Sequence, residues 1–145
     1  MKKAIWFDLD GTVADLYGVE NWLDYLLASD TTPYIEAAPM LNMSLLARYL
    51  NKLQTQGWTI GVISWTTKNG TDLYNGEVAL AKLAWLHKHL RSVAWDSINI
   101  VPYGTNKREV CGGGILFDDE EGNRAIWGEG AYEPYEIINI LKGLS

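Results

Sequence analysis

The stretch Ile5-Trp6-Phe7-Asp8-Leu9-Asp10-Gly11-Thr12-Val13 decides the fold of this chain of 145 residues. The run from residue 3 to residue 7 is mainly apolar and stops at Asp8, which is typical of a buried strand. The carboxylates of Asp8 and Asp10 follow the end of this strand, separated by a single residue. Gly11 permits a sharp turn and a close approach of the backbone to a ligand. The stretch therefore predicts a buried strand with acidic groups at its carboxyl end.

Helices and strands alternate along the rest of the chain. Apolar residues spaced three and four apart predict helices, and short apolar runs predict strands. The predicted helices are residues 19–27, 45–53, 78–90, 106–111 and 135–144, and the further predicted strands are 59–63, 98–101, 115–117 and 125–127, the last an edge strand. Residues 29–40 are expected to be irregular and residues 68–76 to form a loop. The alternation predicts an α/β fold with a parallel sheet of about five strands, covered by helices on both faces.

Three of these strands end in an oxygen-bearing residue, namely Asp8, Ser64 and Asp118. Asp and Ser commonly end strands and begin turns, which is a sufficient explanation for any one of these positions. The three positions together, with the second acid at Asp10 and the acidic run 118–121, favour a common site. In parallel sheets of this kind, ligands bind at the carboxyl ends of the strands. We therefore expect these polar groups to line one crevice.

The acidic residues Asp8, Asp10, Asp118 and Asp119 indicate a metal site. Carboxylates that lie close together repel one another, which is costly without a cation. Mg²⁺ binds through one or two carboxylates and shares its other positions with water and phosphate. A carboxylate can also attack phosphorus and form an aspartyl-phosphate. The sequence thus predicts Mg²⁺ as the cofactor and a small phosphorylated molecule as the substrate.

A phosphate group in an acidic pocket also needs hydrogen-bond donors and a positive charge. Ser64 offers a hydroxyl group at a strand end, and Lys107 lies in the connection that leads to the Asp118 strand. Lys82 and Lys68 are rivals of Lys107 for this role. Lys82 is expected to be a solvated lysine on the surface of its helix, and Lys68 lies just past Ser64.

The sequence resembles the haloacid dehalogenase superfamily of phosphohydrolases. The matching segments, in chain order, are Ile5–Val13 with its Asp-x-Asp-Gly-Thr motif, Gly61-Val62-Ile63-Ser64, Lys107, and Ile115-Leu116-Phe117-Asp118-Asp119. The resemblance implies a three-layer Rossmannoid fold in which the Asp8 strand is central. It implies that Asp8 is the nucleophile and a metal ligand. Asp10 would protonate the leaving oxygen and then activate water, with its backbone carbonyl on the metal. Asp118 would bind Mg²⁺ directly or through water, and Asp119 would support it.

The resemblance also implies which residues bind the substrate. Ser64 and Lys107 would hold the phosphoryl oxygens, and Thr12 of the first motif is counted with them. Trp65 follows Ser64 and offers a ring that can stack on a substrate base or sugar. A tryptophan of the core or rim is the other interpretation of Trp65, because tryptophan is highly buried on average.

Members of the superfamily usually carry a cap over the substrate. Residues 17–41, within a single domain of residues 1–145, hold only one short predicted helix and a proline-containing loop. The resemblance therefore implies a minimal cap, with either a large substrate or a second copy of the chain that completes the cap. The pair Ala14-Asp15 is also similar to deoxyribonucleotidase-like members, which favours a nucleotide as the substrate.

Composition excludes several other classes. The chain has 18 acidic and 12 basic residues, a net charge of -6, so nucleic acid is not expected as a partner. The apolar runs are too short for a membrane span, and Asp8 follows Met1-Lys2-Lys3 too soon for a signal peptide. The single cysteine, Cys111, permits no internal disulfide and fits a reducing compartment. A cytoplasmic location is expected.

The sequence predicts a Mg²⁺-dependent phosphatase that hydrolyses a phosphomonoester, with a nucleotide among its candidate substrates, through an aspartyl-phosphate. The alternatives are a phosphotransferase, a nucleic-acid end phosphatase, or a catalytically idle module that binds phosphate or metal. A signalling receiver domain also combines a parallel sheet with acidic residues and a lysine. Its phospho-accepting Asp would follow the third strand, but the third predicted strand here ends at Val101 and is followed by Pro102.

Overall fold

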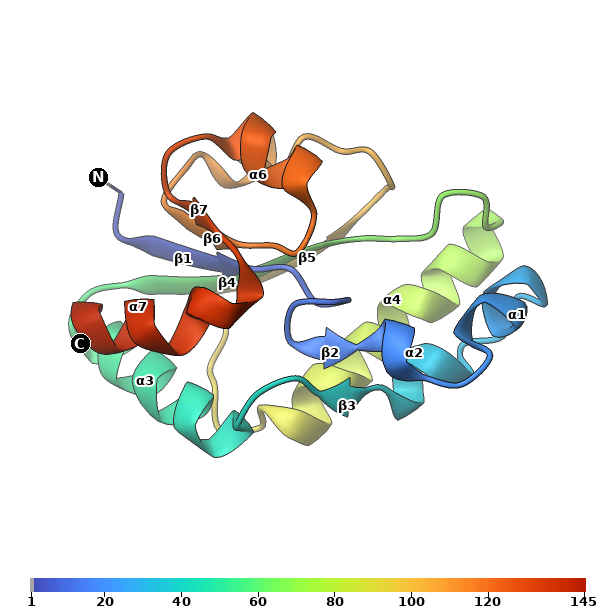
Figure 1. Cartoon of the computed structure of the whole chain (residues 1–145), viewed down its shortest axis with the longest axis horizontal. Helices are drawn as coiled ribbons and strands as arrows, with labels where there is room; N and C mark the ends of the chain where they lie inside the picture. Colours follow the sequence, from blue (N-terminus) through green and yellow to red (C-terminus); the bar gives the residue numbers. More distant parts are fainter. Residues whose placement is uncertain (1) are drawn as a thin grey trace.

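A five-stranded parallel sheet forms the centre of the molecule. The computed structural model describes residues 2–145. In spatial order, the strands are β5 (Ser97–Val101), β4 (Thr59–Trp65), β1 (Ala4–Phe7), β6 (Ile115–Phe117) and β7 (Ala131–Tyr132) (Figure 1). The α/β fold and the central position of the Asp8 strand are therefore confirmed.

Strand β1 is buried on both of its faces. Phe7 points into the main core, where its ring stacks on Phe117 with 5.3 Å between the ring centroids. Trp6 points to the opposite face, because side chains alternate along a strand. It covers Gly61 of β4, where an added Cβ atom would come within 2.4 Å of the Trp6 ring. Gly61 therefore makes the room that Trp6 needs beside the central strand.

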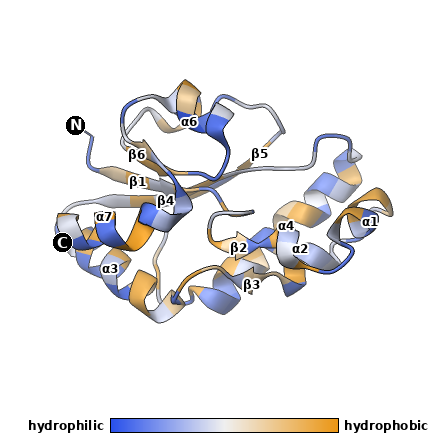
Figure 2. Ribbon diagram, in the orientation of Figure 1, coloured by the Kyte–Doolittle hydropathy of each residue, from blue (hydrophilic) through white to orange (hydrophobic). Residues whose placement is uncertain are grey.

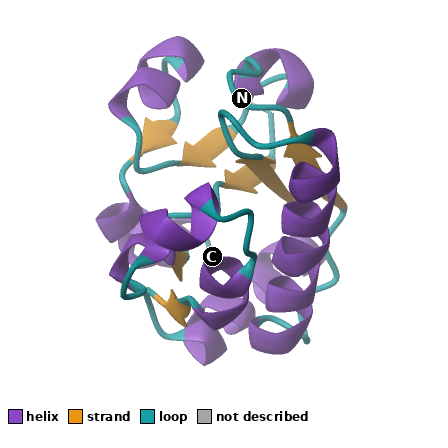
Figure 3. Ribbon diagram, turned by 90° about the vertical axis from the view of Figure 1, so that its right-hand side faces the viewer, coloured by secondary structure: helices purple, strands orange, loops and turns teal. Residues whose placement is uncertain are grey.

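Helices cover both faces of the sheet, and in the turned view the strands run between them (Figure 3). The main core joins one face to α3 (Met43–Thr55), α4 (Asp72–His89) and α7 (Ile137–Leu144). The other face packs on α5 (Lys107–Cys111) and α6 (Glu121–Trp127). Polar and apolar residues alternate along α3 and α4, as expected of helices with one buried side (Figure 2). Among residues 2–145, no helix has both the length and the apolar character needed to cross a membrane.

A small insertion follows the first motif. Strand β2 (Ala14–Asp15) pairs antiparallel with β3 (Ala38–Pro39). Between these strands lie, in order, η1 (Leu16–Gly18), α1 (Trp22–Leu27) and α2 (Thr32–Glu36). The insertion packs on α4 through Leu16 and Tyr34, which contact Val78 and its neighbours. The insertion thus adds a second wall beside the carboxyl ends of the strands.

The prediction that residues 29–40 are irregular was wrong in part, because α2 and β3 lie within them. Pro33 stands in the first turn of α2, where the missing N–H of proline costs nothing. The same proline that indicated a loop therefore lies in the first turn of a helix.

The prediction of a strand at residues 125–127 was also wrong. These residues form the last turn of α6, and the fifth strand of the sheet is β7. A short apolar run is compatible with either a strand or a helix when periodicity is the only guide. Gly128 ends the helix with a φ of 82°, a conformation that favours glycine.

The long helix begins earlier than predicted. Residues 78–90 were expected to be helical, but α4 starts at Asp72, so the predicted loop 68–76 is helical in its second half. Thr71 caps the helix by accepting a hydrogen bond from the amide of Tyr74 at 3.1 Å. The first part of the helix was missed because residues 68–76 are mainly polar and include Gly76, which is exposed.

Candidate active site

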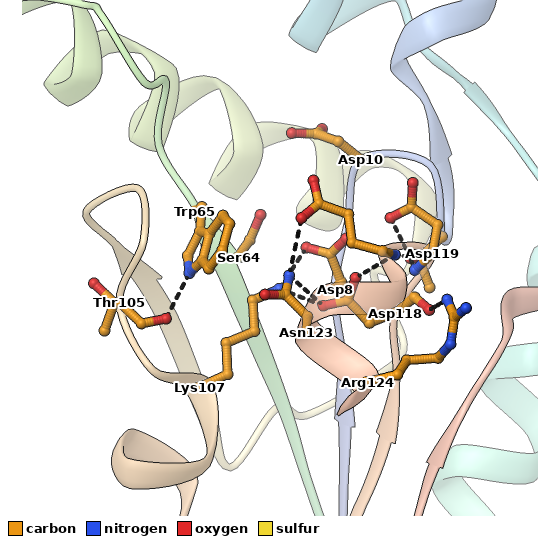
Figure 4. Close-up of polar contacts among 12 residues, drawn as sticks. Asp8, Asp10, Ser64, Trp65, Thr105, Lys107, Asp118, Asp119, Asn123 and Arg124 are labelled. Carbon is orange, nitrogen blue, oxygen red and sulfur yellow. Dashed lines mark hydrogen bonds and ion pairs between the residues drawn. The ribbon is translucent and has the colours of Figure 1, made fainter. Parts of the chain in front are cut away.

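The carboxyl ends of β1 and β6 bring Asp8 and Asp118 together. The amide of Asp8 donates to the carbonyl of Phe117 at 3.0 Å, and that of Asp118 donates to the carbonyl of Tyr132 at 3.1 Å. Both residues therefore continue the parallel sheet beyond their strands. The ammonium group of Lys107, at the start of α5, lies 3.1 Å from Asp8 Oδ1 and 2.7 Å from Asp118 Oδ2 (Figure 4). All three side chains are buried, and Asp118 is 0% exposed.

The single positive charge of Lys107 faces several carboxylates. Burial lowers the pKa of Lys107, but the charges of Asp8 and Asp118 outweigh burial, so that the pKa lies above its usual value. Burial and the charge of Asp8 raise the pKa of Asp118, although Lys107 opposes them. Burial and the charge of Asp8 also raise the pKa of Asp119 to about 8. The cluster thus holds more negative charge than Lys107 neutralises.

The turn after β1 holds Asp119 against Asp8. Thr12 Oγ1 lies 3.3 Å from Asp8 Oδ2 and 3.4 Å from Asp119 Oδ1, and it accepts a hydrogen bond from the amide of Asp119 at 3.2 Å. Its one hydroxyl hydrogen serves one of the two carboxylates at a time. Gly11 has a φ of +77°, and a Cβ atom there would come within 2.3 Å of Asp119 Oδ2, so this turn requires glycine. Thr12 is buried among these groups, and its role in substrate binding stays a prediction.

A possible metal site lies among three of the four predicted ligands. Asp8, Asp118 and Asp119 each offer a carboxylate oxygen, and these oxygens lie within 4.8 Å of one another. Hard oxygen ligands and excess negative charge suit Mg²⁺. The fourth residue, Asp10, directs its carboxylate away from this group and toward Lys82. The metal contact expected of its backbone carbonyl stays a prediction.

Lys82 was predicted to be a solvated surface lysine, and this prediction was wrong. The side chain is 2% exposed and extends from α4 to Asp10 and Ser64. Its Nζ lies 2.9 Å from Asp10 Oδ2, 2.8 Å from Ser64 Oγ and 2.7 Å from the carbonyl oxygen of Trp65. An ammonium group has three hydrogens, and each of them has an acceptor here. The ring of Tyr34, 5.4 Å from Nζ, covers it from the side of the insertion.

The bond from Lys82 determines where the hydroxyl hydrogen of Ser64 can go. Because an ammonium group only donates, Ser64 Oγ must be the acceptor in this bond. The hydrogen of Ser64 is therefore free to point to another acceptor. Since Ser64 lines the cavity that also contains Asp8, a phosphoryl oxygen in that cavity could be this acceptor.

Two polar residues beside Asp118, Asn123 and Arg124, were not predicted. Asn123 Nδ2 donates to Asp118 Oδ2 at 3.2 Å and to Glu120 Oε2 at 3.3 Å, and Arg124 donates to the carbonyl of Asp118 at 3.0 Å. The amide of Glu120 donates to Asp118 Oδ1 at 2.9 Å. Asn123 and Arg124 were missed because a strand was predicted at residues 125–127, and a strand there hides that α6 turns Asn123 back toward Asp118.

The cavity in front of Asp8 has a volume of about 310 Å³. Trp65 forms part of its wall, with its ring half-buried and its Nε1 donating to the carbonyl of Thr105 at 2.9 Å (Figure 4). Trp65 is therefore both a rim tryptophan and a residue that a ligand can reach. Lys68 also lines the cavity, and its ammonium group lies over the ring of Tyr103, at 5.9 Å from the ring centroid.

Comparison with known proteins identifies the fold. No protein-family model matches the chain, and no curated protein matches it in sequence. Among solved structures, it is similar to the D,D-heptose 1,7-bisphosphate phosphatase from Burkholderia thailandensis, with a TM-score of 0.56 and 14% identity, over 98% of this chain and 97% of that one. It is also similar to the D,D-heptose 1,7-bisphosphate phosphatase from B. bronchiseptica complexed with magnesium and phosphate, with a TM-score of 0.56 and 15% identity, over 99% of this chain and 98% of that one.

The chain therefore has the fold of the haloacid dehalogenase superfamily, over nearly its whole length and with a small cap. At this level of identity the likeness shows the fold alone. The activity of this chain must be argued from its own residues.

Proposed function

We propose that the chain is a Mg²⁺-dependent phosphatase that hydrolyses a phosphomonoester through an aspartyl-phosphate at Asp8, with a nucleotide as a candidate substrate. One observation carries the proposal. Asp8 is buried at the end of the central strand, in contact with Lys107 and in one carboxylate cluster with Asp118 and Asp119. A carboxylate with a cation beside it can attack an electrophilic phosphorus and return to its charged form afterwards.

The reaction has two displacements at phosphorus. A carboxylate oxygen of Asp8 attacks the phosphorus, the bond to the alcohol oxygen breaks, and protonated Asp10 gives its proton to that oxygen. Asp10 then takes a proton from water while the water oxygen attacks the same phosphorus. The bond between phosphorus and Asp8 breaks, which releases phosphate and regenerates the Asp8 carboxylate. Asp10 takes up in the second step the proton that it gave in the first, so the protons balance over the cycle.

Ser64 and Lys107 would bind the phosphoryl oxygens. The hydroxyl hydrogen of Ser64 is free because Lys82 already donates to its oxygen. Lys107 Nζ lies 3.1 Å from Asp8 Oδ1 and carries the positive charge that an incoming phosphate needs. Together they would hold the phosphate at the carboxylate that attacks it.

Mg²⁺ fits the remaining negative charge. Asp8, Asp118 and Asp119 would hold it, since their oxygens lie within 4.8 Å of one another. When bound, it would neutralise charge on the carboxylates and the phosphate. Burial and then the charge of Asp8 raise the pKa of Asp119 to about 8, so its charged form is costly without a cation. The similar phosphatase from B. bronchiseptica was crystallised with magnesium and phosphate.

The test is the release of phosphate from p-nitrophenyl phosphate and from a panel of nucleotides, with and without Mg²⁺. We expect turnover that requires Mg²⁺ in the wild type and is lost in Asp8→Asn. Ile126→Ala, an exposed change on α6, is the control and should behave like the wild type. A folded wild type that binds Mg²⁺ but turns over no phosphomonoester would reject the proposal in favour of a binding module.

A further inference from the structure

Two aromatic pairs line the cavity in front of Asp8. Trp65, the last residue of β4, and Tyr103, which follows β5, lie with their ring centroids 4.8 Å apart. Tyr17 and Trp22, from the insertion, lie with their ring centroids 4.9 Å apart. All four rings line the same cavity as Asp8, so the phosphate site has aromatic surface on both the sheet side and the insertion side.

One ring of each pair has a large exposed surface. Tyr17 is 46% exposed and Tyr103 is 48% exposed, although each packs against a tryptophan. Neither tyrosine belongs to a core cluster of the fold. Exposed aromatic surface that gathers at one cavity, next to groups that can bind phosphate, is typical of a ligand site.

The charges of the cavity disfavour a second phosphate group. Within residues 2–145, the basic side chains that line this cavity are Lys68 and Lys107, and Lys107 is already paired with Asp8 and Asp118. A second phosphate would meet one exposed lysine, Lys68, beside the carboxylate of Glu120 and the carboxylate of Asp10, which is already paired with Lys82. A sugar that carries two phosphates, as the substrates of the similar solved structures do by name, would gain little here.

From these observations we infer that the cavity selects phosphomonoesters whose alcohol carries a planar aromatic ring, such as a nucleoside. The ring packs on the exposed faces of Tyr103 and Tyr17 while the phosphate lies at Asp8. This inference rests on the proposed function, because it assigns the phosphate to the Asp8 end of the cavity. Stacking of one base on an aromatic side chain is strong enough to raise affinity about 10-fold or more.

The experiment compares two ligands that differ only in the ring. Adenosine 5'-monophosphate and ribose 5-phosphate share the sugar and the phosphate, and only the former has a base. Titration calorimetry with Asp8→Asn in the presence of Mg²⁺ measures binding without turnover. We expect the nucleotide to bind about 10-fold or more tightly than the sugar phosphate. Equal affinities, or tighter binding of ribose 5-phosphate, would overturn the inference.

Aromatic variants locate the origin of the preference. In the Asp8→Asn background, Tyr103→Ala and Tyr17→Ala should each bring the affinity ratio closer to one by weakening binding of the nucleotide alone. Tyr135→Ala is the matched control, because Tyr135 is 78% exposed and lies outside this cavity. A ratio that neither cavity variant changes would also overturn the inference.

The two proposals fail in different ways. If the wild type releases no phosphate from any ester but Asp8→Asn still prefers the nucleotide, the proposed catalysis is wrong and the inferred selectivity stands. If the wild type hydrolyses both esters with equal kcat/KM and binding shows no preference, the catalysis stands and the inferred selectivity is wrong.

Discussion

Lys107 and Lys82 approach the Asp-x-Asp motif from opposite faces of the sheet. Both ammonium groups are buried, at 4% and 2% exposure, and both contact a carboxylate of the Asp-x-Asp motif. Lys107 lies between Asp8 and Asp118, so its two partners are both charged. Lys82 has one charged partner, Asp10, and two neutral ones, the hydroxyl of Ser64 and the carbonyl of Trp65.

The difference between their partners separates two roles. Lys107 neutralises the carboxylates that would attack phosphorus and hold a metal. Lys82 contacts none of these carboxylates. It donates to both Asp10 and Ser64, so it would position the acid and the hydroxyl group. One lysine therefore neutralises charge, and the other fixes the positions of its partners. Variants of the two lysines should differ in their response to Mg²⁺ as well as in the size of their effects on stability and kcat.

The largest effect is expected for Lys107→Met. Removing one partner of a buried ion pair costs about 3 to 5 kcal/mol, because a buried charge loses its compensation. Loss of the charge beside Asp8 should also lower kcat by about 100-fold or more. Urea denaturation and steady-state kinetics measure the two changes.

The rise in melting temperature on adding Mg²⁺ is a second measurement on Lys107→Met. Without the ammonium group, Asp8 and Asp118 keep more unneutralised charge, so Mg²⁺ should raise the melting temperature more than it does in the wild type. An equal rise in both proteins would contradict the view that the lysine and the metal neutralise the same carboxylates.

A smaller and different effect is expected for Lys82→Met. Asp10, Ser64 and the Trp65 carbonyl each lose a donor, which should lower stability by about 1 to 3 kcal/mol. With the acid and the hydroxyl no longer fixed, kcat should fall by about 10- to 100-fold. The rise in melting temperature on adding Mg²⁺ should stay as in the wild type, because Asp8, Asp118 and Asp119 are untouched.

Two further variants control this result. Lys88→Met removes an exposed lysine of the same helix and should leave kcat unchanged. Lys82→Arg keeps the charge, but a planar guanidinium cannot reproduce the three contacts of an ammonium, so partial recovery of kcat is expected. If Lys82→Met changes the response to Mg²⁺ as Lys107→Met does, the proposed difference between the lysines is wrong.

A third prediction concerns Asn123, which donates to Asp118 as Lys107 does. Asn123→Ala removes donors to Asp118 and Glu120 but leaves the Lys107 contact in place. We expect a loss of about 1 to 2 kcal/mol in stability and a severalfold lower kcat, smaller than for either lysine. Asn139→Ala, at an exposed position of α7, is the matched control. A loss as large as that of Lys107→Met would show that Asn123, rather than the lysine, holds Asp118.

The sequence predicted the elements whose apolar pattern is unambiguous. Strands β1, β4 and β6 were found with the polar residues that end them, because a buried parallel strand is a continuous apolar run. The elements near the end of the chain were predicted less accurately. The run at residues 125–127 fits either a strand or a helix, and β7 has only the two residues Ala131–Tyr132, too few to give a pattern.

The two lysines show which site residues a sequence can indicate. Lys107 was found because motif order points to it, and the structure brings it to Asp8 and Asp118. Lys82 was misread because a lysine on a helix is usually solvated. Yet positions 78, 81, 82 and 85 share one face of α4, and the other three carry Val, Ala and Trp. A lysine within an apolar stripe was the available signal that it is buried and paired.

The smallest effect is expected for Gly76→Ala, which separates the stability of α4 from the role of the lysine it carries. A Cβ atom at Gly76 would meet nothing within 4 Å, so replacing this helical glycine should stabilise the protein by about 0.5 to 1 kcal/mol. Activity should not change. When combined with Lys82→Met, it should restore part of the lost stability but none of the lost kcat. Recovery of kcat together with stability would mean that Lys82 only supports its helix, and the distinction between the two lysines would then disappear.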